Sequence, residues 1–236
     1  MATVLVTGAN RGLGLEFVRQ YAADGWNVVA TARKPEESEA LRTLSAGHTN
    51  LTPLALDITD DESVQDLADS LDGKPIDVLI LNSGVYPREG QKIGQIDYEG
   101  WRKAFETNVL GTMRVIEALL ENVEASERKQ IAAISTSMAS LRGVQGGSVA
   151  QAGTSYQYRS TKTALNMAFS ILAKELAPRR ISVVMFDPGW VKTDMGGPHA
   201  QLTPKESIAG MRKVLEGNAM EISGKFLGHD GSLRPW

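Results

Sequence analysis

The stretch Thr7-Gly8-Ala9-Asn10-Arg11-Gly12-Leu13-Gly14 follows a run of aliphatic and β-branched residues at 3–7 and precedes an amphipathic stretch at 13–24. Glycines between a strand and a helix permit a tight turn and let a phosphate group approach the backbone closely. The start of the helix then offers free N–H groups and the positive end of its dipole to an anion. The stretch therefore predicts a nucleotide-binding loop, with an ordinary glycine-rich turn as the alternative.

Short apolar runs alternate with longer amphipathic stretches along the rest of the chain. Strands are predicted at 3–7, 27–31, 51–56, 76–81, 130–135, 181–186 and 224–227, and helices at 13–24, 36–46, 60–72, 100–124, 155–177 and 204–216. Several strands are apolar on both faces, which is typical of a sheet covered by helices on both sides. The alternation predicts parallel strands joined by right-handed crossovers. We therefore expect an α/β fold: one doubly wound, Rossmann-type domain over 1–236, with a seven-stranded, mostly parallel sheet flanked by helices.

Composition excludes several classes of protein. A chain of 236 residues suits one α/β domain, and a net charge of −3 provides no basic surface for nucleic acid or anionic lipid. The absence of cysteine excludes disulfides and fits a reducing compartment. No apolar run approaches the roughly 18 residues of a membrane helix, and the first residues lack the pattern of a signal peptide. We expect a cytoplasmic protein without a metal site and without a membrane or nucleic-acid partner.

The glycine loop has the spacing T-G-x-x-x-G-x-G, which differs from the G-x-G-x-x-G of other dehydrogenases. It resembles the short-chain dehydrogenase/reductase family, whose further motifs can be followed in order from residue 7 to residue 193. The ending at 223–236 is similar to the compact carbonyl reductase-like subgroup related to the C-factor signalling protein and to sniffer. The resemblance implies a dinucleotide cofactor and hydride transfer at a carbonyl or alcohol.

The end of the second predicted strand indicates which cofactor is used. An acidic residue at this position binds the ribose 2′-hydroxyl of NAD, whereas Ala32 stands here and Arg33 follows. A guanidinium can bind the 2′-phosphate of NADP through two hydrogen bonds. Arg11 resembles a second basic residue of NADP-preferring members. NADP is therefore the predicted cofactor, the alternative being two solvated arginines without a role.

Other cofactor contacts are implied by the resemblance. Asp57 after the third strand resembles the residue that contacts adenine, and Asn82-Ser83-Gly84 resembles the Asn-Asn-Ala-Gly turn with two departures. The segment 187–194 resembles the Pro-Gly-x-x-x-Thr motif that holds the nicotinamide carboxamide. The residues expected to bind the cofactor are Gly8, Asn10, Arg11, Gly12, Leu13, Gly14, Arg33, Asp57, Ile58, Asn82, Gly84, Tyr158, Lys162, Pro188, Gly189, Val191 and Thr193.

A Tyr-x-x-x-Lys pair, Tyr158 and Lys162, lies in the predicted helix at 155–177. The spacing stacks both side chains beside the apolar stripe of that helix, where an ammonium without a role would be costly to bury. The alternative is a lysine that extends into solvent beside a surface tyrosine. A free phenol has a pKa of about 10, and a nearby ammonium and the cationic oxidised nicotinamide would both lower it and ease proton exchange with an alkoxide. The resemblance implies that Tyr158 is the general acid/base and that Lys162 also holds the nicotinamide ribose.

Three more polar residues are candidates for the catalytic site. Asn108 lies inside an apolar stripe, where its carboxamide needs partners. The resemblance implies that Asn108 anchors a proton-relay water near the lysine, and the alternative is a structural hydrogen bond to a neighbouring strand. Ile134-Ser135-Thr136 matches the family's Ile-Ser-Ser, which favours Thr136 as the hydroxyl that holds the substrate oxygen, with Ser137 as the alternative. Alternation along a continuing strand would direct the two hydroxyls to opposite faces.

These features predict an NADP-dependent oxidoreductase that transfers hydride between the nicotinamide and a carbonyl or secondary alcohol. A regulatory or signalling protein that binds NADPH with little or no turnover is the alternative. Loops 85–97, 141–157 and 190–203 are expected to form the substrate walls, which suggests a partly apolar ligand. The family's usual pairing through the helices that hold Asn108 and Tyr158 implies a homodimer or a tetramer. The candidate wall residues are Tyr86, Leu141, Val144, Tyr156, Trp190 and Met195.

Overall fold

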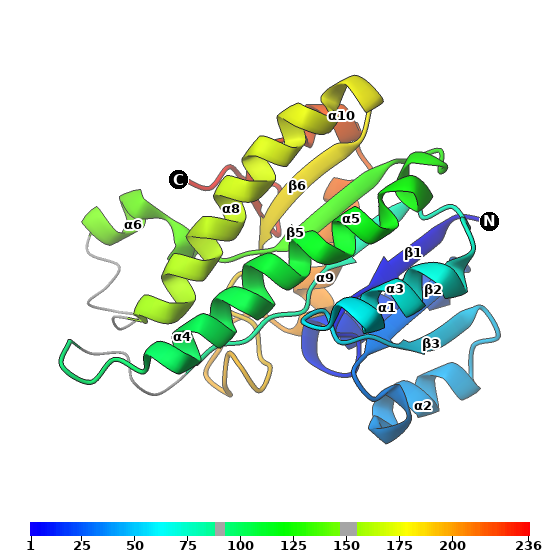
Figure 1. Ribbon diagram of the computed structural model, residues 1–236, viewed down its shortest axis with the longest axis horizontal. Helices are drawn as coiled ribbons and strands as arrows, with labels where there is room; N and C mark the ends of the chain where they lie inside the picture. The colour runs from blue at the N-terminus through cyan, green and yellow to red at the C-terminus, as the bar shows by residue number, and fades with distance from the viewer. Residues whose placement is uncertain (88–92, 147–154) are drawn as a thin grey trace.

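The computed structural model describes residues 1–87, 93–146 and 155–236, and its centre is a seven-stranded sheet (Figure 1). The strands are β1 (Thr3–Val6), β2 (Asn27–Ala32), β3 (Leu51–Ala55), β4 (Val78–Leu81), β5 (Gln130–Ile134), β6 (Ser182–Asp187) and β7 (Phe226–Gly228). They lie in the order β3-β2-β1-β4-β5-β6-β7, and every neighbouring pair is parallel. The predicted Rossmann-type fold is confirmed. The strand order reverses between β1 and β4, the position at which such sheets bind ligands.

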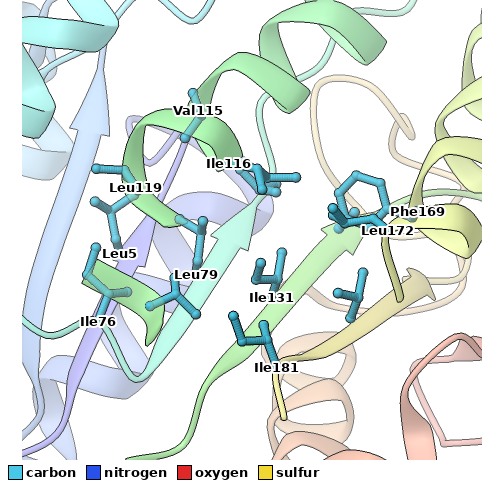
Figure 2. Packing of buried hydrophobic residues seen from close by; sticks show 14 of the residues in the cluster. Leu5, Ile76, Leu79, Val115, Ile116, Leu119, Ile131, Phe169, Leu172 and Ile181 are labelled. Carbon is cyan, nitrogen blue, oxygen red and sulfur yellow. The ribbon is translucent and has the colours of Figure 1, made fainter. Parts of the chain in front are cut away.

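Helices cover both faces of the sheet, as the doubly apolar strands require. Helices α3 (Asp61–Leu71), α5 (Gly111–Glu124) and α8 (Tyr156–Leu176) pack on one face, and α1 (Gly12–Ala23), α2 (Glu39–Ala46) and α9 (Pro204–Leu215) on the other. Figure 1 shows α5 and α8 in front of the sheet and α9 behind it. Figure 2 shows Ile116 of α5 and Phe169 of α8 above Ile131 of β5, all fully or almost fully buried.

Helix starts follow local capping chemistry. Ser38 accepts a hydrogen bond from the Leu41 N–H and so begins α2. The predicted helix at 36–46 is therefore divided into a short 3-10 turn, Pro35–Glu37, and α2. Thr203 and Glu206 form a reciprocal capping box at the start of α9. The short helices α6 (Leu141–Gln145) and α10 (Ala219–Ile222) were not among the predicted elements.

The predicted helix at 100–124 is interrupted. The structure instead has α4 (Tyr98–Phe105), a π-helical turn at Glu106–Leu110, and α5. A β-carbon on Gly111, the first residue of α5, would lie 2.5 Å from the Ile58 carbonyl oxygen, so the chain passes close to the loop after β3 at this point. π turns are frequent at functional sites, and Asn108 lies in this one. Among the residues that the structure describes, no helix is long and apolar enough to cross a membrane.

Candidate active site

The glycine loop between β1 and α1 has the backbone geometry that a bound phosphate requires. Gly8 and Gly12 have φ values of +66° and +57°, a region that side-chain-bearing residues rarely adopt. A β-carbon on Gly14 would overlap the Gly8 carbonyl oxygen. Arg11 precedes α1 in an extended conformation and contributes no side-chain cap to the helix. The start of α1 is thus open to a pyrophosphate group.

Asn82 holds this loop in shape. Its side-chain amide donates to the carbonyl oxygens of Thr7 and Gly8, at 2.9 and 3.1 Å. The Thr7 hydroxyl in turn accepts hydrogen bonds from the backbone N–H groups of Asn82 and Ser83, both at 3.0 Å. Asn82 was expected to contact the cofactor, and the structure shows its amide bound to the loop that would do so. The partners are about 75 residues apart in sequence, so no local pattern indicated this role.

The predicted adenosine-binding residues lie at the ends of β2 and β3. Arg33 is exposed directly after β2. Burial would raise the pKa of Asp57, but hydrogen bonds from Thr59 and the charge of Arg33 together hold it below its usual range. Arg11 pairs with Asp194 at 3.0 Å, and both side chains are more than two-thirds exposed. Exposed pairs of this kind contribute little, so Arg11 can exchange its partner for a phosphate.

The loop after β6 lies against the glycine loop. A β-carbon on Gly12 would lie 3.6 Å from Cγ2 of Thr193, so the two predicted cofactor segments meet. Gly189 has a φ of +77°, and a side chain there would meet Leu202 at 2.6 Å. The Pro188 carbonyl oxygen accepts a hydrogen bond from Ser207 of α9 at 2.7 Å, which ties the loop to the helix behind it.

Gly84, Asn108 and Lys162 come together from three separate elements. Lys162 is buried in α8, and its Nζ donates to the Ile134 carbonyl oxygen at the end of β5, at 2.8 Å. A β-carbon on Gly84 would lie 3.4 Å from this Nζ and 3.2 Å from Oδ1 of Asn108. Only glycine leaves that space free. The buried lysine of the Tyr-x-x-x-Lys pair therefore lies beside the loop after β4.

The Asn108 side chain is fully buried and hydrogen-bonded to protein. Oδ1 accepts from the Val85 N–H at 2.8 Å, and Nδ2 donates to the Val85 carbonyl oxygen and to Oγ1 of Thr161, each at 3.0 Å. Both amide hydrogens are thus engaged, and Oδ1 keeps one lone pair. These partners lie in the loop after β4 and in α8, whereas the structural alternative expected from the sequence was a hydrogen bond to a neighbouring strand. Thr161, which lies within the Tyr-x-x-x-Lys segment, is a partner that the sequence reasoning missed.

Electrostatics at Tyr158 differ from the sequence-based expectation. We expected the nearby ammonium to lower the pKa of the phenol. Instead, burial raises the pKa of Tyr158 above its ordinary value, and the Asp187 carboxylate and Tyr86 add to the effect. Burial also lowers the pKa of Lys162 to about 8, so the cation is less favoured than in water. The phenol is therefore kept protonated, which is the state of a proton donor.

Two neighbours shape this environment. The Tyr86 ring packs edge-on against the Tyr158 ring, with centroids 4.7 Å apart, and its hydroxyl bonds Ser155 at 2.7 Å. Asp187, at the end of β6, accepts a hydrogen bond from Nε of Arg234 at 3.0 Å. The position of Tyr86 after β4 made it a candidate wall residue, whereas no sequence signal connected Arg234 with the site.

Thr136 and Ser137 follow β5 in a different backbone conformation from the one expected. The strand ends at Ile134, and the hydroxyl of Ser135 is buried against Asn166 at 2.6 Å. Oγ1 of Thr136 accepts from the Met138 N–H at 3.2 Å, and Thr136 is half-buried. Ser137 is exposed and begins a 3-10 turn. Strand alternation therefore cannot separate the two hydroxyls, because the strand has already ended.

Most of the predicted wall residues lie on the surface. The predicted wall residues Leu141, Val144, Tyr156, Trp190 and Met195 are all exposed, and Tyr86 is half-buried. Parts of two predicted wall loops, 88–92 and 147–154, lie outside the described residues. The remaining wall residues come from the loops after β4, β5 and β6.

Comparison with known proteins agrees with this arrangement. The family model for short chain dehydrogenase matches residues 2–202. The NADPH-bound carbonyl reductase from chicken fatty liver is 32% identical, with a TM-score of 0.92 over 100% of this chain and 99% of that one. The carbonyl reductase Sniffer of D. melanogaster is 28% identical, with a TM-score of 0.90 over the full length of both chains. C-signal of Myxococcus xanthus is 37% identical over 164 residues, which are 69% of this chain and 93% of that protein. The chain belongs to the short-chain dehydrogenase/reductase family.

Proposed function

We propose that this protein is an NADP-dependent oxidoreductase that transfers hydride between the nicotinamide and a carbonyl or secondary alcohol. The observation that carries the proposal is the burial of Tyr158 and Lys162 beside Gly84 and Asn108, at the edge of the sheet where the glycine loop lies. The chicken relative is a carbonyl reductase with bound NADPH, and a Rhodococcus relative that is 30% identical over the full length of both chains is named as a dehydrogenase.

NADPH would supply a hydride to the carbonyl carbon, and the chain's own residues would manage the proton. Tyr158 donates its phenolic proton to the developing alkoxide as a general acid. Lys162, mostly cationic at neutral pH, holds the nicotinamide ribose. Thr136 or Ser137 donates a hydrogen bond to the substrate oxygen. Asn108 fixes the loop after β4 through Val85 and uses the remaining lone pair of Oδ1 for a relay water.

The cofactor would lie along the carboxyl ends of β1, β2, β4 and β6. The amides of the glycine loop hold the pyrophosphate, and Arg33 and Arg11 hold the 2′-phosphate. The loop at 188–193 holds the nicotinamide. The alternative of a regulatory protein with little turnover gains no support, because Tyr158, Lys162 and Asn108 are all present and their segments meet.

The test of this function is the loss of NADPH absorbance on addition of aldehydes and ketones. We expect turnover with several aromatic or aliphatic carbonyls, and slower or no turnover when NADH replaces NADPH. If NADPH binds but no carbonyl in a broad panel is reduced, and no alcohol is oxidised with NADP, the protein is a binding protein instead.

Arg33→Asp is expected to weaken NADP binding by about 10- to 100-fold, because a charge-assisted hydrogen bond of about 1.5–3 kcal/mol is replaced by repulsion. NAD binding should change little or improve. Calorimetric titration of both cofactors measures the change, and Lys174→Glu, an equal change of charge on exposed α8, is the control. If Arg33→Asp leaves the selectivity between NADP and NAD unaltered, Arg33 does not bind the 2′-phosphate.

We also propose a homodimer formed through α4, α5 and α8, which could pair again into a tetramer. The support is a set of large apolar side chains, each more than half exposed, on these helices and on the π turn between them: Tyr98, Leu110, Met167 and Ile171. Burying such side chains favours association. Light scattering at micromolar concentration should give at least twice the mass of one chain, and a monomer would contradict the proposal.

Residues 1–236 are proposed to act as one domain in the cytoplasm. The single sheet that includes both β1 and β7 supports one domain, because strands from both ends of the chain share one core. The absence of cysteine fits a reducing compartment. Fractionation of the source cells, with detection of the protein in the cytosolic fraction, tests the location.

A further inference from the structure

Arg159, the residue after Tyr158, has a buried guanidinium that the proposed reaction does not use. Only 7% of the residue is exposed. Its Nη1 donates to the Met138 carbonyl oxygen at 3.3 Å. Its Nε and Nη2 are buried and have no hydrogen-bond partner within the described parts of the chain. Two charged donors on one edge of the group are therefore left without an acceptor.

Another arginine of the same chain shows what this edge can bind. Arg179 donates from Nε and Nη2 to the two carboxylate oxygens of Glu124, with the Nε contact at 2.9 Å. The Nε and Nη2 donors are parallel, and their spacing matches the two oxygens of a carboxylate. The two donors that Arg179 uses are the two that Arg159 leaves without a partner.

The lack of a partner at Arg159 is costly. Burial lowers the pKa of Arg159, although the neighbouring Tyr86 hydroxyl acts in the opposite direction. A buried charge without an anion or a full set of hydrogen bonds destabilises the folded chain. An apolar residue of similar size would avoid this cost if packing were the only requirement. The guanidinium is thus better explained by an anion that binds during function.

Its position places that anion near the loop after β5, which carries Thr136 and Ser137. Arg159 reaches Met138, whose N–H bonds the Thr136 hydroxyl. Tyr86 packs edge-on against Tyr158 and also affects the pKa of Arg159, so the guanidinium and the Tyr158 ring have a neighbour in common. A ligand that presents its carbonyl to Tyr158 could therefore present a second group to Arg159.

We propose that Arg159 binds a carboxylate of the substrate, so that the preferred substrates are aldehydes or ketones that also carry a carboxylate group. This inference rests on the proposed oxidoreductase function. In this proposal Arg159 determines which substrates are preferred, and Tyr158 still transfers the proton. The planar fork of two donors favours a carboxylate over a neutral polar group.

The test compares 4-carboxybenzaldehyde with its uncharged methyl ester, methyl 4-formylbenzoate. In the wild-type protein, kcat/KM should be higher for the acid. In Arg159→Met the ratio of the two kcat/KM values should fall by about 10- to 100-fold, the range expected for loss of charge-assisted hydrogen bonds. Arg159→Lys keeps the charge but loses the two parallel donors. Its ratio should therefore lie between the ratios of the wild-type protein and of Arg159→Met. Lys213→Met, which removes an exposed charge from α9, should keep the wild-type ratio.

Binding without turnover separates this inference from the proposed function. Calorimetric titration of the NADPH-loaded protein with 4-(hydroxymethyl)benzoate, a pair that cannot exchange hydride, should show binding that Arg159→Met weakens and Lys213→Met does not. If binding depends on Arg159 but no carbonyl is reduced, the anion site stands and the oxidoreductase function fails. If Arg159→Met lowers kcat/KM for acid and ester equally, or wild type does not distinguish them, Arg159 is a structural residue and the inference is overturned.

Discussion

Tyr158→Phe is expected to reduce the turnover of carbonyl substrates by about 10²–10⁴-fold, the usual contribution of a general acid. The substitution removes only the phenolic hydroxyl and keeps the ring that packs against Tyr86. The affinity for NADPH should therefore remain close to the wild-type value. Steady-state loss of NADPH absorbance measures turnover, and fluorescence titration measures cofactor binding.

Tyr21→Phe is the matched control. Tyr21 is also buried, and burial raises its pKa to about 12, but it lies on α1 among residues of the opposite core. Its substitution should leave turnover near the wild-type level. If Tyr158→Phe keeps most of its activity, the proton must come from another group, and the assignment of Tyr158 fails.

Thr136→Val is expected to reduce kcat by about 10²–10³-fold, the effect of losing one hydrogen-bond donor to the reacting oxygen. Oγ1 of Thr136 accepts from the Met138 N–H, so its hydroxyl is held in place and its proton can still be donated to a ligand. Ser137 is exposed in the following turn, and Ser137→Ala should change kcat only a few-fold. The measurement is kcat with saturating NADPH and one carbonyl substrate.

A loss of stability could imitate this effect, because Thr136 also caps the turn at Ser137–Ala139. Removing such a cap costs about 1 kcal/mol. Thr136→Ser keeps both the cap and the donor and should retain activity, and thermal melting identifies any unfolded variant. The opposite result, with Ser137→Ala inactive and Thr136→Val active, would transfer the role to Ser137.

The fold could be predicted because its information is local. The doubly apolar strands and the alternation with amphipathic helices depend on spacing alone, and strand ends were correct to within two residues. The predicted helix at 100–124 was wrong at its π turn. The interruption ends at Gly111, whose close approach to the Ile58 carbonyl joins segments far apart in sequence.

In the candidate site, too, the features that depend on short motifs could be predicted, and the contacts between distant segments could not. The positions of Tyr158 and Lys162, four residues apart on one helix, follow from a short motif. The contact of Asn82 with the glycine loop and the pairing of Asp187 with Arg234 depend on distant segments and left no local signal. The rise of the Tyr158 pKa in the cofactor-free chain could not be predicted, because it comes from burial and from the neighbours Asp187 and Tyr86, and sequence does not measure burial depth.

Transfer of deuterium from the nicotinamide is the most direct test of the central claim. The wild-type protein is mixed with NADPH that carries deuterium at the transferred position of nicotinamide C4 and with an aldehyde substrate. Mass spectrometry should find one deuterium on the carbinol carbon of the alcohol product, and Tyr158→Phe should form that product far more slowly. An unlabelled alcohol, or NADPH bound at full occupancy with no alcohol formed from any carbonyl, would contradict the account.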